Sequence, residues 1–244
     1  MRSGKIGPFF IPVFAVLISL ATVSPARADL LLGFPNGLTG WSTYGDAGTV
    51  SASGGMATIT ESASASETDL YLSFILPTGA QSLQFTINSV SPDSAYASGV
   101  LPDAFGASFG VITPDPTGVN PPAVSSLVPT VDPTTDSFYT MDVVTNANPA
   151  LAATGVTVSS SPGIFAQASV DLPSNLDGQS AGILFRLIGG TDPDSTSTVT
   201  ISNVEIITAA AVPEPTSIVY GLTAILLAGV LRLRSRGRLR RATA

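Results

Sequence analysis

The sequence predicts a mainly β protein, an antiparallel jelly-roll β-sandwich with one apolar segment near each end of the chain. Three observations favour this fold class. Between residues 29 and 207, short runs alternate apolar and polar residues and are separated by Gly, Pro, Asn and Asp. No long segment has helical periodicity. The chain has no cysteine, so the fold must depend on a hydrophobic core.

The first 28 residues are typical of a signal peptide. Two basic residues precede the apolar run Phe9–Ala21, which only Pro12 and one serine interrupt. Ala26 and Ala28 fit the small-x-small cleavage rule, so we expect the mature protein to begin at Asp29. The alternative is an uncleaved N-terminal anchor.

Charge is unevenly distributed along the chain. The body, residues 29–212, holds 16 of the 17 carboxylates and only one basic residue, Arg186, a net charge of −15 against −7 for the whole chain. Such a body does not bind nucleic acid or anionic lipid through its net field. It attracts divalent cations or basic partners, unless the acidic loops are only solvated surface.

Eleven segments are predicted strands. Leu83, Phe85 and Ile87 alternate with polar residues and should point inward, and Gly54-Gly55 suits a two-residue hairpin turn. The predicted strands are Leu30–Phe34, Gly48–Ser53, Met56–Glu61, Leu70–Leu76, Ser82–Val90, Gly106–Ile112, Phe138–Val144, Gly155–Ser159, Ile164–Leu172, Ala181–Ile188 and Ser197–Ile207.

The last predicted strand changes face halfway. Val199 and Ile201 lie on one side of an ideal strand, whereas Val204 and Ile206 lie on the other. A β-bulge between the two pairs would return all four side chains to one buried face.

Two stretches are predicted loops. Pro114–Thr135 is rich in proline and reads as a surface loop or a flap. Thr145–Thr154 is shorter and similar in composition.

The C-terminus has three parts in a fixed order. Residues 208–217 form a linker that ends in the motif Pro213-Glu214-Pro215 and two hydroxyl residues. Residues 218–231 are uncharged and predict a short transmembrane helix, about 21 Å long at ~1.5 Å per residue. Residues 232–244 form a basic tail that favours stop-transfer and a cytoplasmic C-terminus. The tail arginines are Arg232, Arg234, Arg236, Arg238, Arg240 and Arg241. The alternative for the apolar run is a buried core helix.

This arrangement resembles the PEP-CTERM sorting signal of exported bacterial proteins. The resemblance implies that a membrane protease-transpeptidase, an exosortase, recognises Pro213, Glu214 and Pro215 and removes the signal. It also implies transient anchoring in the inner membrane, followed by delivery to the cell surface or the exopolysaccharide matrix. The two prolines suit this role because they keep the segment extended and accessible.

Missing residue types exclude several kinds of catalysis. The chain has no histidine and no cysteine, and the body has no lysine. A Ser-His-Asp triad, a cysteine nucleophile, a histidine metal site and a Schiff base are therefore excluded from the body. A pair of carboxylates or an oxygen-ligand calcium site is still possible chemically.

Trp41, the only tryptophan, and Tyr44 are candidates for a platform that stacks on a sugar ring. The alternative is that Trp41 fills the core. The stretch Gly37-Leu38-Thr39-Gly40-Trp41 and the closing run Ile201–Ile206 resemble carbohydrate-binding jelly-roll domains of the galactose-binding-like type. Ser202 stands where that family often has Asp, so the resemblance does not supply a calcium ligand there.

Asp192 and Asp194 are candidate calcium ligands, but their run lacks the later ligands and the glycine of an EF-hand loop. A turn before the last strand is the alternative. No other cofactor is indicated.

The sequence thus predicts an exported, acidic protein without enzymatic activity, with a structural or glycan-binding role at the cell surface. The expected partners are an exosortase, the membrane and extracellular polysaccharide, but not nucleic acid. The alternative is a carbohydrate-active enzyme that uses a carboxylate pair.

Overall fold

The computed structural model describes residues 29–46, 49–62, 66–92, 103–143, 147–189 and 197–209, together with Ile225. This part of the chain forms fourteen strands in two antiparallel sheets and a 3-10 turn at Ser174–Leu176. The expectation of a mainly β fold is confirmed. None of the helices among these residues is long and apolar enough to cross a membrane. The predicted signal peptide, sorting motif and basic tail lie outside the described residues, as does the predicted apolar helix apart from Ile225, and all of them stay predictions.

Each sheet has seven strands. The first sheet runs in the order β11-β12-β6-β14-β4-β3, with β1 also paired to β14. Its strands are β1 (Leu30–Leu31), β3 (Val50–Ser53), β4 (Met56–Thr60), β6 (Ala80–Ser91), β11 (Val156–Ser161), β12 (Ile164–Asp171) and β14 (Thr198–Thr208).

The second sheet runs in the order β10-β9-β7-β13-β5-β2, with β8 also paired to β7. Its strands are β2 (Ser42–Tyr44), β5 (Glu67–Ile75), β7 (Ala104–Thr113), β8 (Ala123–Ser126), β9 (Ser137–Asp142), β10 (Ala147–Ala152) and β13 (Ser180–Ile188).

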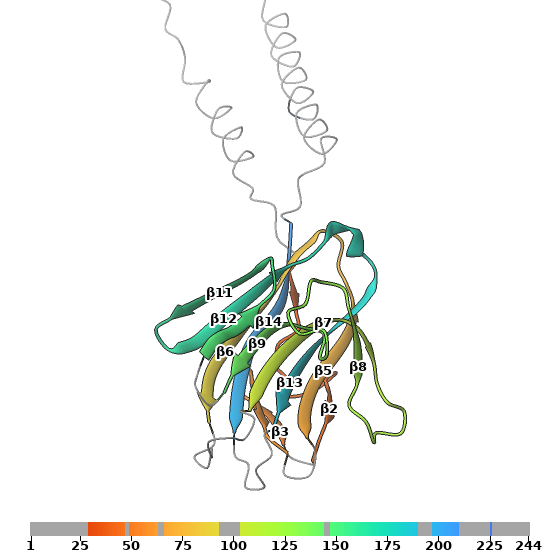
Figure 1. The fold of residues 1–244 in the computed structure, drawn as a ribbon. Helices are drawn as coiled ribbons and strands as arrows, with labels where there is room; N and C mark the ends of the chain where they lie inside the picture. Colours follow the sequence, from red (N-terminus) through yellow and green to blue (C-terminus); the bar gives the residue numbers. More distant parts are fainter. Residues whose placement is uncertain are drawn as a thin grey trace, which may run out of the picture. The chain divides into compact units, whose positions relative to one another are not determined.

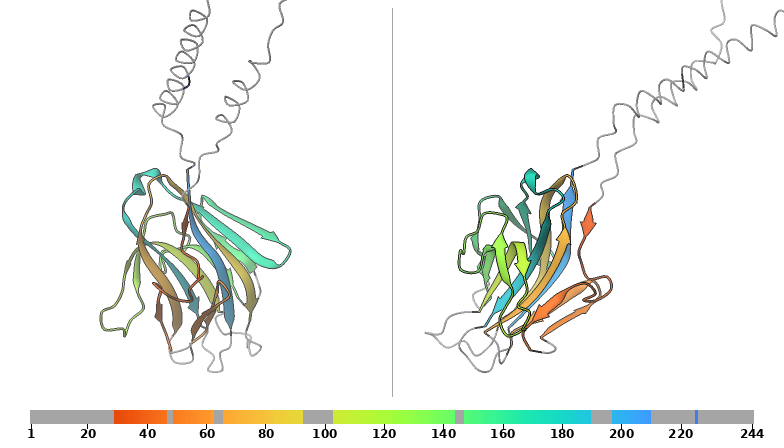
Figure 2. Two further views of the ribbon diagram at one scale, coloured as in Figure 1. Left: turned by 180° about the vertical axis from the view of Figure 1, so that it is seen from behind. Right: turned by 90° about the vertical axis from the view of Figure 1, so that its right-hand side faces the viewer.

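The chain passes repeatedly from one sheet to the other (Figures 1 and 2). Strands β4, β5, β6 and β7 alternate between the sheets, and so do β12, β13 and β14. This connectivity is consistent with the jelly roll expected from the sequence.

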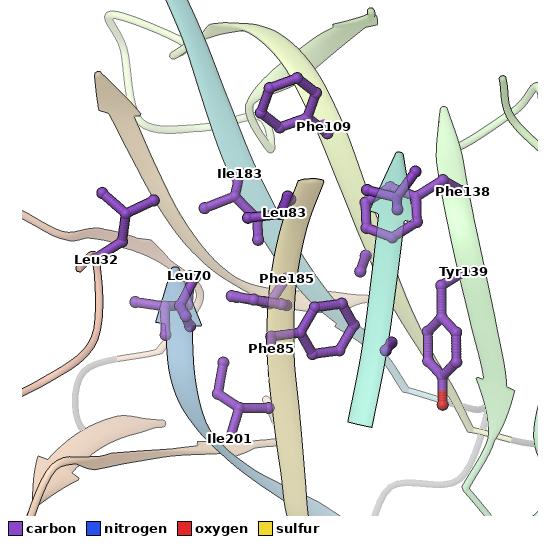
Figure 3. Packing of buried hydrophobic residues seen from close by; sticks show 14 of the residues in the cluster. Leu32, Leu70, Leu83, Phe85, Phe109, Phe138, Tyr139, Ile183, Phe185 and Ile201 are labelled. Carbon is purple, nitrogen blue, oxygen red and sulfur yellow. The ribbon is translucent and has the colours of Figure 1, made fainter. Parts of the chain in front are cut away.

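Aromatic rings fill the space between the sheets. Phe85 on β6 has its ring centroid 5.1 Å from that of Phe185 on β13 and 5.8 Å from that of Tyr139 on β9. Figure 3 shows these side chains in the core with Leu83 and Ile183. Leu83, Phe85 and Ile87 are fully buried, as their alternation predicted.

The predicted β-bulge lies at Asn203 in β14. The pairing with β6 shifts between Ser202 and Glu205, and Asn203 has a φ of 51°. Asn tolerates this left-handed conformation better than most residues. Because the bulge inserts one extra residue, Ile201 and Val204 are both buried although an ideal strand would separate them.

Each of the eleven predicted strands overlaps an observed strand, although the first is Leu30–Leu31 rather than Leu30–Phe34. Gly54-Gly55 makes the expected β3–β4 turn with positive φ at both residues. The three strands that the sequence did not predict are β2, β8 and β10. Each of them pairs with a single neighbour in the second sheet. Such strands need little apolar alternation, and β10 even contains Pro149, which a central strand would exclude. The predicted loop Thr145–Thr154 is therefore largely strand.

The Pro-rich stretch is only partly a loop. Its second half contains β8, which lies so close to β7 that a Cβ on Gly110 would come 2.2 Å from the carbonyl oxygen of Ser125. Its first half, residues 114–122, connects β7 to β8 and extends toward β2, as a contact described below shows (Figure 1). We call residues 114–122 the Pro-rich connection. It covers part of the outer face of the second sheet.

Candidate functional site

Trp41 belongs to the core, which was the alternative to a sugar-stacking role. The residue is 9% exposed, and its indole N–H donates to the carbonyl oxygen of Leu32 at 3.0 Å. Its ring centroid lies 5.0 Å from that of Phe34 and 6.1 Å from that of Phe185. The proposed platform of Trp41 and Tyr44 is therefore wrong for Trp41, because its ring is packed between the sheets.

Tyr44 instead lines a hollow of about 290 Å³ on the outer face of the second sheet, here called the tyrosine hollow. The volume is near the lower end of the range for small-molecule sites, which starts at roughly 300 Å³. The lining residues are Thr43, Tyr44, Gly45, Asp46, Tyr71, Asp115, Gly118, Asn120 and Pro122.

Two adjacent strands and the Pro-rich connection build this hollow. Tyr44 on β2 lies opposite Asp69 on β5, and Tyr71 is two residues further along β5. Side chains two residues apart point to the same side of a strand. The hydroxyl of Tyr44 donates to the carbonyl oxygen of Val119 at 3.1 Å, which joins the edge strand to the connection.

Asp115 organises the connection. Its carboxylate accepts hydrogen bonds from the backbone N–H of Thr117 at 2.9 Å and of Asn120 at 2.8 Å, and from both of these side chains. These hydrogen bonds hold the pKa of Asp115 far below its ordinary value, and the bond from the backbone N–H of Thr117 contributes most. Asp115 is thus a permanent negative charge that keeps the connection folded.

The second carboxylate of the hollow is Asp46, directly after β2. Its Oδ2 accepts a hydrogen bond from the hydroxyl of Ser62 at 2.6 Å, and its backbone carbonyl oxygen accepts from the hydroxyl and the N–H of Thr49. These hydrogen bonds hold Asp46 in place.

A buried ionic cluster lies next to the tyrosine hollow. Arg186 on β13, only 8% exposed, donates from Nε and from a terminal guanidinium nitrogen to Asp69 at 3.0 and 3.2 Å. Its Nε also lies 3.4 Å from a carboxylate oxygen of Glu67. The same terminal nitrogen donates to the carbonyl oxygen of Pro122 at 3.1 Å, and Pro122 lines the hollow. The only basic residue of the body thus connects the sheet to the wall of the hollow.

Two carboxylates share this one guanidinium in a place that water barely reaches. Burial raises the pKa of Asp69 to about 7, although the hydrogen bonds and charge of Arg186 oppose the shift. Burial also raises the pKa of Glu67, against the charge of Arg186. The cluster therefore binds a proton more readily in the folded protein than in the unfolded chain.

We predict that the free energy of unfolding falls as pH rises from about 4 to 7. Between the ordinary pKa values and the raised ones, the folded state holds more protons than the unfolded state, so deprotonation disfavours folding. The contribution of proton binding by Asp69 and Glu67 to stability is complete below about pH 4 and lost above about pH 7. Its size is on the order of a few kcal/mol. Urea unfolding at pH 5 and pH 7.5 measures it, and Asp69→Asn should flatten the dependence. A stability that rises over this interval in the wild type, and not in Asp69→Asn, would contradict the prediction.

The same geometry bears on the alternative of a carboxylate-pair enzyme. Asp69 is completely buried and Glu67 has only 12% of its side chain exposed, so neither faces a substrate freely. In the tyrosine hollow, Asp115 is bound by its own loop and has a pKa too low for a general acid. Burial thus disfavours Asp69 and Glu67, and its low pKa disfavours Asp115, as the general acid of a carboxylate pair.

Among the residues that the structure describes, no group of three or more Asp and Glu side chains is placed to hold a metal ion. Asp192 and Asp194 lie outside the described residues, so the calcium site stays a prediction.

A second hollow, of about 330 Å³, lies on the first sheet around the Asn203 bulge. Gln167, Asn203 and Glu205 line it, together with the exposed Leu31 and the backbone of the segment after β1. Its only aromatic lining residue, Phe34, is almost completely buried. It offers amides and a carboxylate but no exposed ring.

Two solved structures share a partial likeness with the chain. One, described as "CBM4 structure and function", has a TM-score of 0.37 and 10% sequence identity, and covers 72% of this chain and 96% of its own. The other, the crystal structure of Caldicellulosiruptor saccharolyticus CBM27-1 in complex with mannohexaose, has a TM-score of 0.39 and 11% identity, and covers 76% and 100%. Because both TM-scores are below 0.5, neither likeness carries an argument about function. No protein-family model and no curated protein matches the chain.

Several residues of the tyrosine hollow had no signal in the sequence. Tyr71 sits in an apolar run that reads as an ordinary strand, and Asp115 and Asn120 sit in a Pro-rich stretch. The Asp115-Pro116-Thr117-Gly118 run does signal a turn. Nothing in the sequence places that turn beside β2, because the contact depends on how the sheet is assembled.

Proposed function

We propose that this protein is an exported, non-enzymatic glycan-binding protein of the cell surface or exopolysaccharide matrix. A signal peptide and a PEP-CTERM signal direct it there, and an exosortase processes the second signal. The jelly-roll body then remains as the functional part. The tyrosine hollow is the proposed glycan site.

The main support for a glycan site is that Tyr44 and Tyr71 line one hollow together with Asp46, Asn120 and two glycines. Sugar rings bind to such sites because their C–H faces pack on aromatic rings while their hydroxyls exchange hydrogen bonds with carboxylates and amides. The site is also pre-formed, since Asp115 and Arg186 hold the connection in place. Little ordering cost therefore opposes binding.

The carboxylate-pair enzyme is the second candidate. The presence of two carboxylates, Asp46 and Asp115, in the same hollow favours it. The hydrogen bonding of Asp115 disfavours it, because a general acid must keep a proton near neutral pH. Release of reducing ends from exopolysaccharide of the native host would reverse this preference.

We predict that Tyr71→Ala and Tyr44→Ala each weaken retention of the mature protein on exopolysaccharide from its own host by about tenfold or more. Affinity electrophoresis in gels with and without the polysaccharide measures the retention. Gln167→Ala, in the second hollow on the other sheet, is the matched control and should bind like the wild type. Equal retention of all four proteins would exclude the tyrosine hollow as the site, and no retention of any would exclude glycan binding.

A further inference from the structure

The strand β11 forms one edge of the first sheet. Among the strands that the structure describes, it pairs with β12 alone (Figure 1). Successive residues of a strand direct their backbone N–H and C=O groups to opposite sides, so about half of these groups in β11 point away from β12. Such a row of backbone groups is a template on which a further strand can pair.

Five other strands in the described part of the chain have a single partner, and each is short or obstructed. The strands β1, β2, β3 and β8 have two to four residues, and β2 is also joined to the Pro-rich connection through Tyr44 and Val119. The strand β10 contains Pro149 and a register shift. In contrast, β11 has six residues and no proline, and its register shifts only near the turn, between Ser159 and Ser161. It therefore lacks most of the devices by which edge strands avoid pairing.

Charge also distinguishes this edge from the rest of the body. The run Val143–Val170 includes β10, β11 and nearly all of β12 and contains no charged residue, although the body has a net charge of −15. The next carboxylate is Asp171, whose backbone N–H donates to the carbonyl oxygen of Gly155 just before β11. Acidic copies of the protein repel each other wherever their carboxylates approach. A basic partner finds no opposite charge on β11, whereas a second copy of the same edge meets no like charge there.

The edge strand is also complementary to itself. Val156 and Val158 are half-buried against the core, and Thr157 and Ser159 between and beyond them are exposed. Residues directly opposite in an antiparallel pair share a face of the sheet. A two-fold axis at Val158 therefore sets this valine against its counterpart, and sets Thr157 against Ser159. The antiparallel direction also places the Asp171 residues of the two copies at opposite ends of the paired strands.

We propose that β11 is a dimerisation edge, on which the β11 strand of a second copy pairs antiparallel about a two-fold axis at Val158. The first sheets of the two copies then form one continuous sheet. A two-fold contact of this kind is closed, so assembly stops at the dimer. The tyrosine hollow lies at β2, at the opposite end of the second sheet's strand order from β10, so the dimer leaves both hollows open. The inference concerns assembly and does not depend on the ligand of the hollow.

Sedimentation velocity of the mature protein at increasing concentration measures the assembly. We expect a reversible equilibrium between monomer and dimer with a dissociation constant on the order of 10–100 μM, because one strand pair buries less surface than a standard interface. Added salt should strengthen the dimer, since it screens the repulsion between two acidic bodies. A protein that is still monomeric at about 1 mM leaves the edge to a strand of another protein and contradicts the proposal. Open assemblies larger than a dimer contradict it too.

Matched charge variants test whether the contact lies on β11. Thr157→Asp combined with Ser159→Asp sets carboxylates opposite carboxylates across the two-fold axis and should weaken dimerisation by about tenfold or more. Ser51→Asp combined with Ser53→Asp adds the same charge to exposed positions of β3, at the other end of the same sheet, and should dimerise nearly as well as the wild type. Equal losses in both variants would assign the effect to net charge and overturn the proposal. A dimer that neither variant weakens lies on another surface and also overturns it.

A third variant tests the register and guards against misfolding as the cause of a loss. Thr157→Lys combined with Ser159→Asp places opposite charges across the same axis and should restore the dimer at low salt. Restoration shows that substitutions at these two exposed positions leave the fold intact. If this variant dimerises no better than the one with two aspartates, the antiparallel pairing about Val158 is wrong.

Discussion

Arg186→Met should destabilise the folded body by about 3–5 kcal/mol. Among the described residues, Arg186 is the only cation near Asp69 and Glu67, and its removal leaves two carboxylates in a place where Asp69 has no solvent exposure. Burial of an unpaired charge costs far more than a buried ion pair contributes. Urea unfolding of residues 29–209 at pH 7.5 measures the loss, and a midpoint within error of the wild type would contradict the prediction.

A triple variant is the control for this effect. Arg186→Met combined with Asp69→Asn and Glu67→Gln removes the cation and both negative charges together. It should be clearly more stable than Arg186→Met alone, because no unpaired charge is left. The single variant also loses the hydrogen bond to the carbonyl oxygen of Pro122, so it should bind glycan less well even under conditions in which it is folded.

Glu214→Ala should change the fate of the protein almost completely. We expect the wild type to lose its C-terminus and leave the membrane, whereas the variant stays membrane-bound at full length. The apolar run and the six tail arginines suffice for stop-transfer, while processing needs the extended Pro-Glu-Pro segment. A tag inserted just before Val212 and a second tag at Ala244 follow the two halves by fractionation and blotting in the native host.

Replacement of the six tail arginines by Gln is the reciprocal control. It should weaken retention and orientation in the membrane while it leaves Pro213, Glu214 and Pro215 intact. If the wild type and Glu214→Ala show the same uncleaved, membrane-bound species, the apolar run is a permanent anchor and the sorting proposal is wrong.

Most of the sandwich could be predicted from the sequence because its central strands bury one face and expose the other. That requirement leaves a period of two in the sequence, as in Leu83, Phe85 and Ile87. The same period also reveals exceptions. In the last strand the apolar residues change from one face to the other, and this change predicted the bulge at Asn203. The strands β2, β8 and β10 were not predictable in this way, because they are short, with three, four and six residues, and lack a regular alternation of apolar and polar side chains.

The candidate site depended on the tertiary structure for a different reason. The sequence by itself determined the chemistry that the body lacks, its acidity and the single arginine. It left open whether Trp41 binds a sugar or fills the core, because a large aromatic side chain suits both places. Only the fold placed Trp41 between the sheets and brought Tyr44, Tyr71 and Asp115 together from three separate segments. Such a juxtaposition follows from strand order and register, which long-range pairing sets and no local pattern encodes.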